Sequence, residues 1–269
     1  MSQSMKPLLP PTTQPRQHLT ASDIAFFFPN QFSLGTLLCI GSLIQMTLCA
    51  ILPLHYAAIP CATALLISIL TTMKNCFQPM TNPFMADVIR GRATAQIPSQ
   101  DGQYGPRPGK GSVVVFHLGI QYNHPLGLFA PHVLEISNRF LALQEDILLR
   151  KDELGLLAVE KWRGSERSSN NTILIKYFFK DVESIHKFAL EPLHKETWAY
   201  YNKHNPGHVG VFHETFITKD GGYESMYVNC HPTLLGRGEV KGTADWMGTL
   251  VSADTPGLRS FGARLGKDD

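Results

Sequence analysis

The sequence lacks charged residues over an unusually long stretch near its N-terminus. No Asp, Glu, Lys or Arg occurs from Ile24 to Met73. A helix on the surface of a soluble protein needs a polar side, which this stretch cannot supply. The apolar part divides at Pro53 into Phe32–Leu52 and Tyr56–Met73. Each piece is close to the ~20 residues that a helix needs to cross a bilayer. We therefore predict a transmembrane helical hairpin over residues 32–76.

Other interpretations of this stretch stay open. One is a buried helical hairpin in the core of a soluble protein. Pro53 and Pro60 also allow a re-entrant or single-span arrangement, because proline interrupts helices. A cleaved signal peptide fits worse, since the apolar region starts late and is too long.

Cations flank the apolar stretch but are absent from the loop between its halves. Lys6 and Arg16 precede it, and Lys74, Arg90 and Arg92 follow it. Cytoplasmic flanks carry an excess of Lys and Arg, so we expect both ends in the cytosol. The expected localisation is the endoplasmic reticulum membrane, with the domain that follows the hairpin on the cytosolic side.

Several signatures of common function classes are also missing. The five cysteines form no CxxC pair, which argues against a disulfide scaffold and a thiolate zinc site. There is no Gly-rich phosphate loop, dinucleotide fingerprint, HExxH or nucleophile elbow. Net charge is +2 with no run of Lys or Arg, so nucleic acid is not an expected partner.

Composition predicts the limits of the folded domain. Residues 1–31 are rich in Pro, Gln, Ser and Thr, and we expect a disordered tail. Residues 77–111 carry many prolines, which predicts a linker or an irregular arm. Within it we expect a short helix at the membrane surface over residues 85–92. From residue 236 to 269, Gly, Pro and charge indicate a loose C-terminal tail.

Residues 112–235 alternate between strand and helix patterns in the order β-α-β-β-α-β, with an extra strand at the end. The strands are expected at 113–123, 156–163, 171–179, 209–218 and, after a turn at 219–222, 223–230; the helices at 131–151, 181–190 and 192–204. This order is typical of ferredoxin-like α+β domains. Helices on one face leave the other face of the sheet uncovered, so we expect the sheets of two chains to pair in a homodimer.

Three groups of side chains are candidates for a site. His117 projects from the face of its strand opposite the apolar row of Phe116 and Leu118, and so toward an interface or cavity. His194, Trp198 and Tyr201 fall at i, i+4 and i+7 and share one face of a helix. Each also has an ordinary packing interpretation, as an interface histidine or as helix-on-sheet contact.

His213 and Glu214 form the third candidate. Neighbours on a strand point to opposite faces, so only one of them can reach a common cavity. His204 and His208 have the spacing of metal ligands, but Pro206 and Gly207 prevent a helix there, and no metal site is predicted. A haem needs a single axial His, so motifs cannot exclude it.

Four segments resemble a known family. They are Leu193-His194-x3-Trp198, His208–Phe216, Tyr223–Asn229 and Pro232–Gly236. They resemble the group named after the fumagillin-pathway monooxygenase, and the likeness extends over roughly Met80 to Gly238. That family is similar to the antibiotic-biosynthesis monooxygenases, which are dimeric α+β barrels that oxidise polyketide- or terpenoid-derived substrates, often without flavin, haem or metal.

The resemblance implies a membrane-anchored monooxygenase of secondary-metabolite biosynthesis. It would act on a small hydrophobic substrate, with O2 as co-substrate and no bound cofactor. A base would remove a proton from an activated carbon to give an anion that reduces O2 directly; we expect His194 or His213, with Glu214, in this role. Expected substrate contacts are His117, Trp198, Tyr201, Tyr227 and Asn229, with Asn229 near a developing oxyanion.

Two alternatives come from other classes. The first is a haem enzyme of the same barrel type, similar to aldoxime dehydratases. The second is a non-catalytic membrane protein that uses the barrel to bind lipid or a protein partner.

Overall fold

The structure is a computed structural model that forms two compact units. It describes residues 5, 7–16, 34–78, 82–99, 101–105, 111–166, 168, 171–219 and 221–267. One unit joins Met1–Ala21 to Ile89–Asp269, and the other is Ser22–Val88. Most of the expected disordered tail at residues 1–31 lies outside the described residues. For residues 7–16 the prediction is wrong, because Pro7 and Thr12 form antiparallel bridges with Val251 and Trp246 of the same unit.

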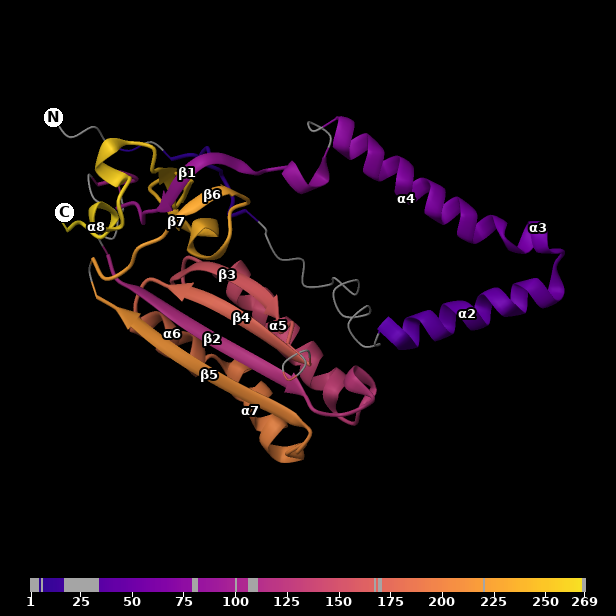
Figure 1. The fold of residues 1–269 in the computed structure, drawn as a ribbon. Helices are drawn as coiled ribbons and strands as arrows, with labels where there is room; N and C mark the ends of the chain where they lie inside the picture. The colour runs from indigo at the N-terminus through magenta and orange to yellow at the C-terminus, as the bar shows by residue number, and fades with distance from the viewer. Residues whose placement is uncertain are drawn as a thin grey trace. The chain divides into compact units, whose positions relative to one another are not determined.

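The smaller unit consists of two long apolar helices and the short segments beside them (Figure 1). Its elements are α2 (Leu34–Ile51), α3 (Leu54–Ala57), α4 (Ile59–Phe77) and the 3-10 turn η3 (Pro83–Met85). Leu34–Ile51 and Leu54–Phe77 are long and apolar enough to cross a membrane, with mean hydropathies of 1.9 and 1.7. Of the most apolar 18 residues in each segment, 0% and 6% are buried, whereas the core helix of a soluble protein would be mostly buried.

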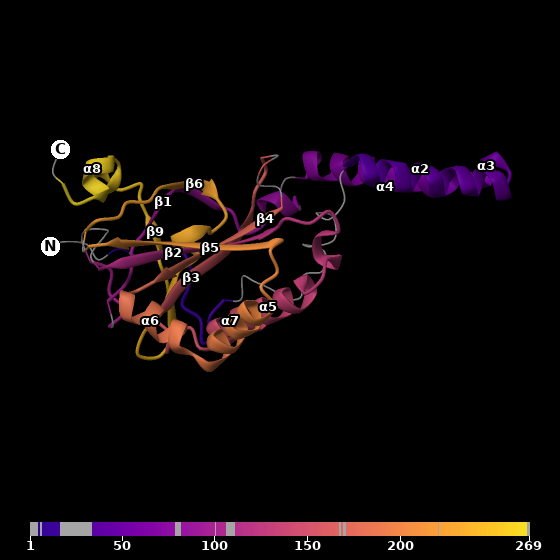
Figure 2. The same ribbon diagram turned by 90° about the horizontal axis from the view of Figure 1, so that it is seen from below.

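A four-stranded antiparallel sheet organises the larger unit. Its strands are β2 (Val113–Tyr122), β3 (Leu156–Arg163), β4 (Thr172–Phe179) and β5 (Val209–Thr218), in the order β3-β4-β2-β5. The helices α5 (Val133–Leu149), α6 (Val182–Leu190) and α7 (Pro192–His204) lie on one face of this sheet (Figure 2). The predicted α+β class and the β-α-β-β-α-β order are confirmed.

Alternation along the strands produces the main core beneath the helices. Val114 and Phe116 of β2 stand beside Phe179 and Tyr177 of β4. They pack with the apolar stripe of α5, which includes Ile147, in one cluster. Ile175, in the middle of β4, is 0% exposed and belongs to the same cluster, so this face of the sheet is fully covered at its centre.

Local sequence signals set the helix boundaries. The carboxylate of Asp181 accepts a hydrogen bond of 2.8 Å from the backbone N–H of Ser184 and so caps α6. Pro192 occupies the first turn of α7, where its missing N–H costs nothing. Asn205 ends that helix in the left-handed region, with φ of 38°.

A second layer of short strands packs against one end of the sheet's other face. It contains a sheet of order β6-β1-β9 and a β7-β8 pair. The bounds of its strands are β1 (Ile89–Ala95), β6 (Tyr227–Cys230), β7 (Glu239–Lys241), β8 (Trp246–Gly248) and β9 (Leu250–Ser252). The turns η5 (Leu234–Arg237) and η6 (Pro256–Leu258) and the helix α8 (Phe261–Arg264) accompany them, whereas η4 (Gly127–Phe129) lies between β2 and α5. Ala95, Leu235 and Phe178 meet in the core between the layers.

This second layer corrects four sequence predictions. The expected linker contains strand β1, and the short surface helix expected at 85–92 does not form. The expected loose tail contains β7, β8 and β9, and Val251 is 0% exposed. The extra strand is only Tyr227–Cys230 and pairs with β1 rather than returning along β5. Strands of three residues are too short to show alternation, and their partners are distant in sequence.

The cap of α6 provides a test of the fold. Replacing Asp181 with Ala should lower the free energy of unfolding by about 1 kcal/mol, because the N–H of Ser184 loses its acceptor. Asp181→Asn is the matched control, since Asn also caps helices and should retain most of the stability. Urea unfolding in detergent measures both, and equal losses in the two variants would contradict this role.

Candidate active site

The face of the sheet away from the helices carries two cross-strand rows of chemically distinctive residues. Glu160, Lys176, His117 and Glu214 are successive partners across β3, β4, β2 and β5. The neighbouring row, in the same strand order, is Trp162, Leu174, Gly119 and Phe212. We call this surface the open face.

Large apolar groups on the open face remain accessible in the single chain. Trp162 is 44% exposed, Phe212 40% and Phe216 50%. The ammonium of Lys176 lies over the ring of Trp162, 5.7 Å from its centroid. Aromatic groups beside one cation and one histidine form a surface suited to an apolar molecule that carries a polar or acidic group.

Gly119 provides the space for Phe212. A Cβ atom at position 119 would lie only 2.0 Å from Cζ of Phe212, so the phenyl ring rests directly on the glycine backbone. Gly119 itself is buried beneath this ring. The lack of a side chain at Gly119 therefore lets the Phe212 ring lie close against the sheet beside His117.

His117 lies between groups of opposite charge. Its Nδ1 atom is 3.9 Å from Oε2 of Glu214, and its ring meets Phe216 edge-on with centroids 5.4 Å apart. Burial lowers the pKa of His117 below its ordinary value, the positive charge of Lys176 adds to this, and Glu214 opposes both. A lowered pKa keeps the imidazole neutral near pH 7, as a general base requires.

One end of the open face is closed by η5. The carboxylate of Glu160 accepts hydrogen bonds from the hydroxyl of Thr233, at 2.7 Å, and from the N–H of Leu234, at 2.6 Å. The same carboxylate lies 3.3 Å from the guanidinium of Arg237. Leu234 has φ of 50°, an unfavourable conformation for Leu that these contacts stabilise. Glu160 therefore has a structural role, whereas His117 and Glu214 remain candidates for a catalytic role.

Of the candidates from the sequence, the structure brings together His117 and Glu214. His213 pairs with Leu118 and lies on the helix side of the sheet, with its ring 5.6 Å from that of Phe116. The prediction that His213 and Glu214 point to opposite faces is confirmed.

The other candidates from the helices lie elsewhere. Nδ1 of His194 is 3.1 Å from the carbonyl of Ala189, and its ring packs on Phe188 of α6. Trp198 and Tyr201 stack on each other with an interplanar angle of 7° on the surface of α7. The hydroxyl of Tyr201 donates to the carbonyl of Val209 at the start of β5.

Tyr227 and Asn229, both on β6, have structural contacts. The hydroxyl of Tyr227 accepts a hydrogen bond of 3.0 Å from the N–H of Gly236, and burial raises the pKa of Tyr227 to about 12. Oδ1 of Asn229 accepts from the N–H of Gly91 at 3.0 Å. These bonds hold the second layer together.

Sequence reasoning missed four residues of the open face: Trp162, Lys176, Phe212 and Phe216. Strand parity could have identified them, because each stands an even number of positions from another residue of that face on its own strand. The missing information was the pairing register, which places these residues beside His117.

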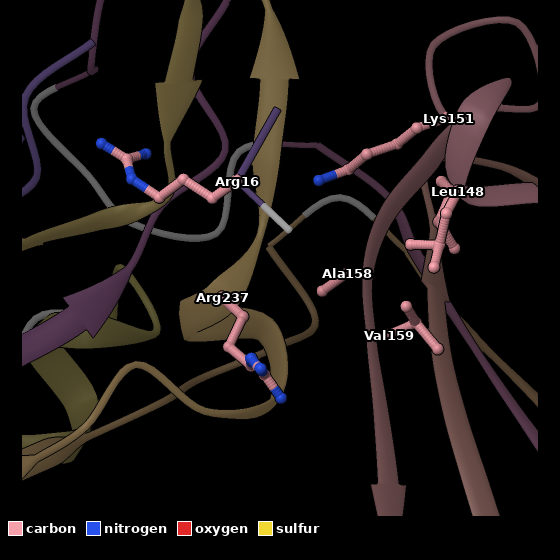
Figure 3. A pocket seen from close by; sticks show the side chains of 7 residues that line it. Arg16, Leu148, Lys151, Ala158, Val159 and Arg237 are labelled. Atoms are coloured by element: carbon pink, nitrogen blue, oxygen red, sulfur yellow. The ribbon is translucent and has the colours of Figure 1, made fainter. Parts of the chain in front are cut away.

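A small cavity lies under the second layer, beyond the end of α5 (Figure 3). It is lined by Arg16, Leu148, Lys151, Leu156, Ala158, Val159 and Arg237. Arg16 and Lys151 contact Glu239, and Arg237 contacts Glu160. Its cations are thus engaged in the fold, and it is not the candidate active site. Among the described residues, no three His, Cys, Asp or Glu side chains gather in a group that could hold a metal ion.

Comparisons with known proteins agree with the resemblance noted in the sequence. The profile of the family described as Monooxygenase af470-like matches residues 113–235. The chain is 78% identical over 275 residues to Monooxygenase af470 of Aspergillus fumigatus, and the match covers 100% of both chains.

Solved structures show more distant likenesses. An aldoxime dehydratase in complex with butyraldoxime has a TM-score of 0.42 at 12% identity, over 54% of this chain and 39% of the dehydratase. SnoaB, a cofactor-independent oxygenase from Streptomyces nogalater, has 0.28 at 12%, over 40% and 94%. An antibiotic biosynthesis monooxygenase assigned in Deinococcus radiodurans has 0.29 at 13%, over 38% and 89%.

The contact between Gly119 and Phe212 yields a direct test. Gly119→Ala should displace the ring, lower kcat/KM and destabilise the fold by about 1–3 kcal/mol, the usual range for overpacking. In Gly119→Ala/Phe212→Ala the clash is absent, so the two effects on unfolding free energy should be non-additive. Additive losses in the double-mutant cycle would contradict this packing.

Proposed function

The chain belongs to the monooxygenase af470-like family, and from that membership we propose that this monooxygenase oxidises a hydrophobic substrate on its open face. The substrate class is a polyketide- or terpenoid-derived carbon acid of secondary metabolism. The reaction uses O2 as co-substrate and needs no flavin, haem or metal. The observation that carries the proposal is His117 beside Glu214, with Phe216 against the His117 ring and Phe212 in the neighbouring row. Trp162 lies on the same face, beneath Lys176.

The proposed reaction begins with proton removal. Neutral His117 takes a proton from an activated CH2 group, and the imidazolium that forms is stabilised by the nearby carboxylate of Glu214. The ammonium of Lys176, on the strand beside His117, stabilises the negative charge that develops on the substrate. The aromatic groups hold the apolar body of the substrate and exclude water.

The carbanion then supplies the electrons for oxygen. It transfers them to O2, a carbon–oxygen bond forms, and the resulting peroxide loses water to give a carbonyl group. The change is CH2 + O2 → C=O + H2O, which balances without an external reductant. Both hydrogen atoms of the water leave the CH2 group as protons, and its oxygen comes from O2. His117 takes the first of these two protons.

The open face requires a cover for this chemistry, and we assign that role to a second copy of the chain. Three exposed aromatic side chains on one sheet face form a surface that soluble monomers seldom leave bare. Two copies related by a two-fold axis would each cover the other's open face. The homodimer would enclose two sites.

The two apolar helices supply a bilayer anchor. Both are long enough for the hydrocarbon core and carry almost no buried residues. A hydrophobic substrate partitions into the same bilayer, so anchoring raises its concentration near the enzyme. We propose the endoplasmic reticulum as the membrane that holds this anchor. Lys and Arg flank both ends of the apolar stretch, which favours a catalytic domain on the cytosolic side.

The pH dependence of kcat/KM tests the assignment of His117. Activity should rise with pH as His117 loses its proton, with an apparent pKa below the ordinary value of a histidine. Lys176→Met removes a charge that lowers this pKa, so the acid limb should move to higher pH. Glu214→Gln removes a charge that raises it, so the limb should move to lower pH. Shifts in the same direction, or none, would argue against His117 as the base.

An absorbance spectrum of the detergent-purified full-length protein, with metal analysis, tests the cofactor proposal. We expect no Soret or flavin band, no stoichiometric metal, and O2 consumption with hydrophobic polyketide carbon acids. A Soret band in active protein would instead assign a haem enzyme and make His117 a candidate axial ligand.

A further inference from the structure

The segment that precedes the apolar helices is part of the larger folded unit. The N–H of Leu8 donates to the carbonyl of Leu250 at 2.8 Å. Thr12 exchanges two backbone hydrogen bonds with Trp246, of 3.1 and 2.7 Å. Residues 7–16 therefore run beside β8 and β9, with antiparallel bridges from Pro7 to Val251 and from Thr12 to Trp246.

The end of this segment is held by a buried carboxylate. Glu239 is 1% exposed, and it accepts a hydrogen bond of 2.8 Å from the backbone N–H of Arg16 and another of 2.6 Å from its guanidinium. The ammonium of Lys151 is 3.4 Å from the same carboxylate. Figure 3 shows Lys151 reaching from beyond α5 toward the segment that carries Arg16.

A carboxylate buried to this extent is stable only when its partners are in place. Removing one partner of a buried ion pair leaves an uncompensated charge, which is strongly destabilising. Two of the three donors to Glu239 come from Arg16, so the pocket around Glu239 is built for the N-terminal segment. The docking of residues 7–16 is thus a specific interaction and not a loose end lying on the surface.

The segment that follows the apolar helices pairs with β9, the strand to which Leu8 is hydrogen-bonded. β1 pairs with β9 through Ala93 with Ser252 and Ala95 with Leu250. Leu250 therefore bonds to Leu8, which precedes the apolar helices, and pairs with Ala95, which follows them. Both flanks of the apolar pair end in one folded unit, on one strand.

We infer that residues 7–16 form a clasp that fixes the membrane topology of the chain: both flanks stay on one side of the bilayer, and the chain crosses it twice. The inference rests on the proposed bilayer anchor. A single crossing would place the clasp and β9 on opposite sides, where they could not pair. The turn between α2 and α4, residues 52–58, then lies on the far side.

The dimensions and contacts of the smaller unit agree with two crossings. Helices α2 and α4 have 18 and 19 residues. At 1.5 Å per residue they span roughly 27 and 29 Å, close to the ~30 Å of the hydrocarbon core. The amide of Gln45 in α2 donates to the carbonyl of Ala57 at 3.1 Å and accepts from the thiol of Cys61 in α4 at 3.0 Å. A polar contact of this kind links helices inside a bilayer.

A disulfide tests the clasp in the membrane-embedded full-length protein. A Cβ atom at position 248 would lie 3.4 Å from Cβ of Leu9, close to the spacing of disulfide-bonded cysteines. Leu9→Cys/Gly248→Cys is made with the native cysteines replaced by Ser and with a protease site inserted between residues 17 and 33. After cleavage and non-reducing electrophoresis, the N-terminal fragment should stay attached, and it should separate on reduction.

Leu9→Cys/Gly257→Cys is the matched control. A Cβ atom at position 257 has no neighbour within 4 Å, so this pair should release the fragment under all conditions. Release from the Gly248→Cys pair at the level of this control would overturn the clasp.

Epitope tags test the topology without any substitution in the fold. Tags at the N-terminus, at the C-terminus and after Pro53 are exposed to protease in sealed microsomes that are resistant to carbonate extraction. Both terminal tags should be digested and the tag after Pro53 protected. Terminal tags on opposite sides, or a Pro53 tag digested with them, would overturn the two crossings. Extraction by carbonate would instead contradict the bilayer anchor, and the disulfide result would then decide the clasp separately.

Discussion

The one-sided cover of the central sheet is the constraint on which the rest of this structure depends. Strand alternation sends one set of residues to α5, α6 and α7, where Phe179 and Ile175 are fully buried. It sends the other set, including His117 and Phe212, to the face opposite α5, α6 and α7. The second layer closes only one end of that face through η5. The remainder is a bounded, partly apolar surface that holds a histidine with a lowered pKa.

The second layer also connects the fold to the apolar helices. Strand β9 pairs with β1 on one side and bonds to the N-terminal segment through Leu8. Glu239 fixes the end of that segment by pairing with Arg16, and the cost of its burial is offset by two cations. The same short strands that frame the open face therefore hold both ends of the proposed membrane anchor. Site geometry and anchoring share one structural element.

Local patterns in the sequence were sufficient for the central domain. The predicted bounds of β3, β5 and α7 agree with the structure, because Pro192 and strand alternation mark them directly. Long-range pairing could not be predicted: β1, β7, β8 and β9 are short, and their partners lie far away in the chain. For the same reason the sequence placed His117 and Glu214 among the candidates but missed Trp162 and Lys176. The proximity of these residues depends on the pairing register between strands, which the sequence of one strand does not determine.

The most direct test of the account compares His117→Ala with His213→Ala in an assay of O2 consumption on a hydrophobic polyketide carbon acid. The two histidines occupy neighbouring strands but opposite faces of one sheet. Loss of the base should reduce the rate by roughly 10²–10⁴-fold in His117→Ala, while His213→Ala should stay within a few-fold of the unchanged enzyme. The reverse result, or equal losses, would contradict the assignment of the open face as the active site.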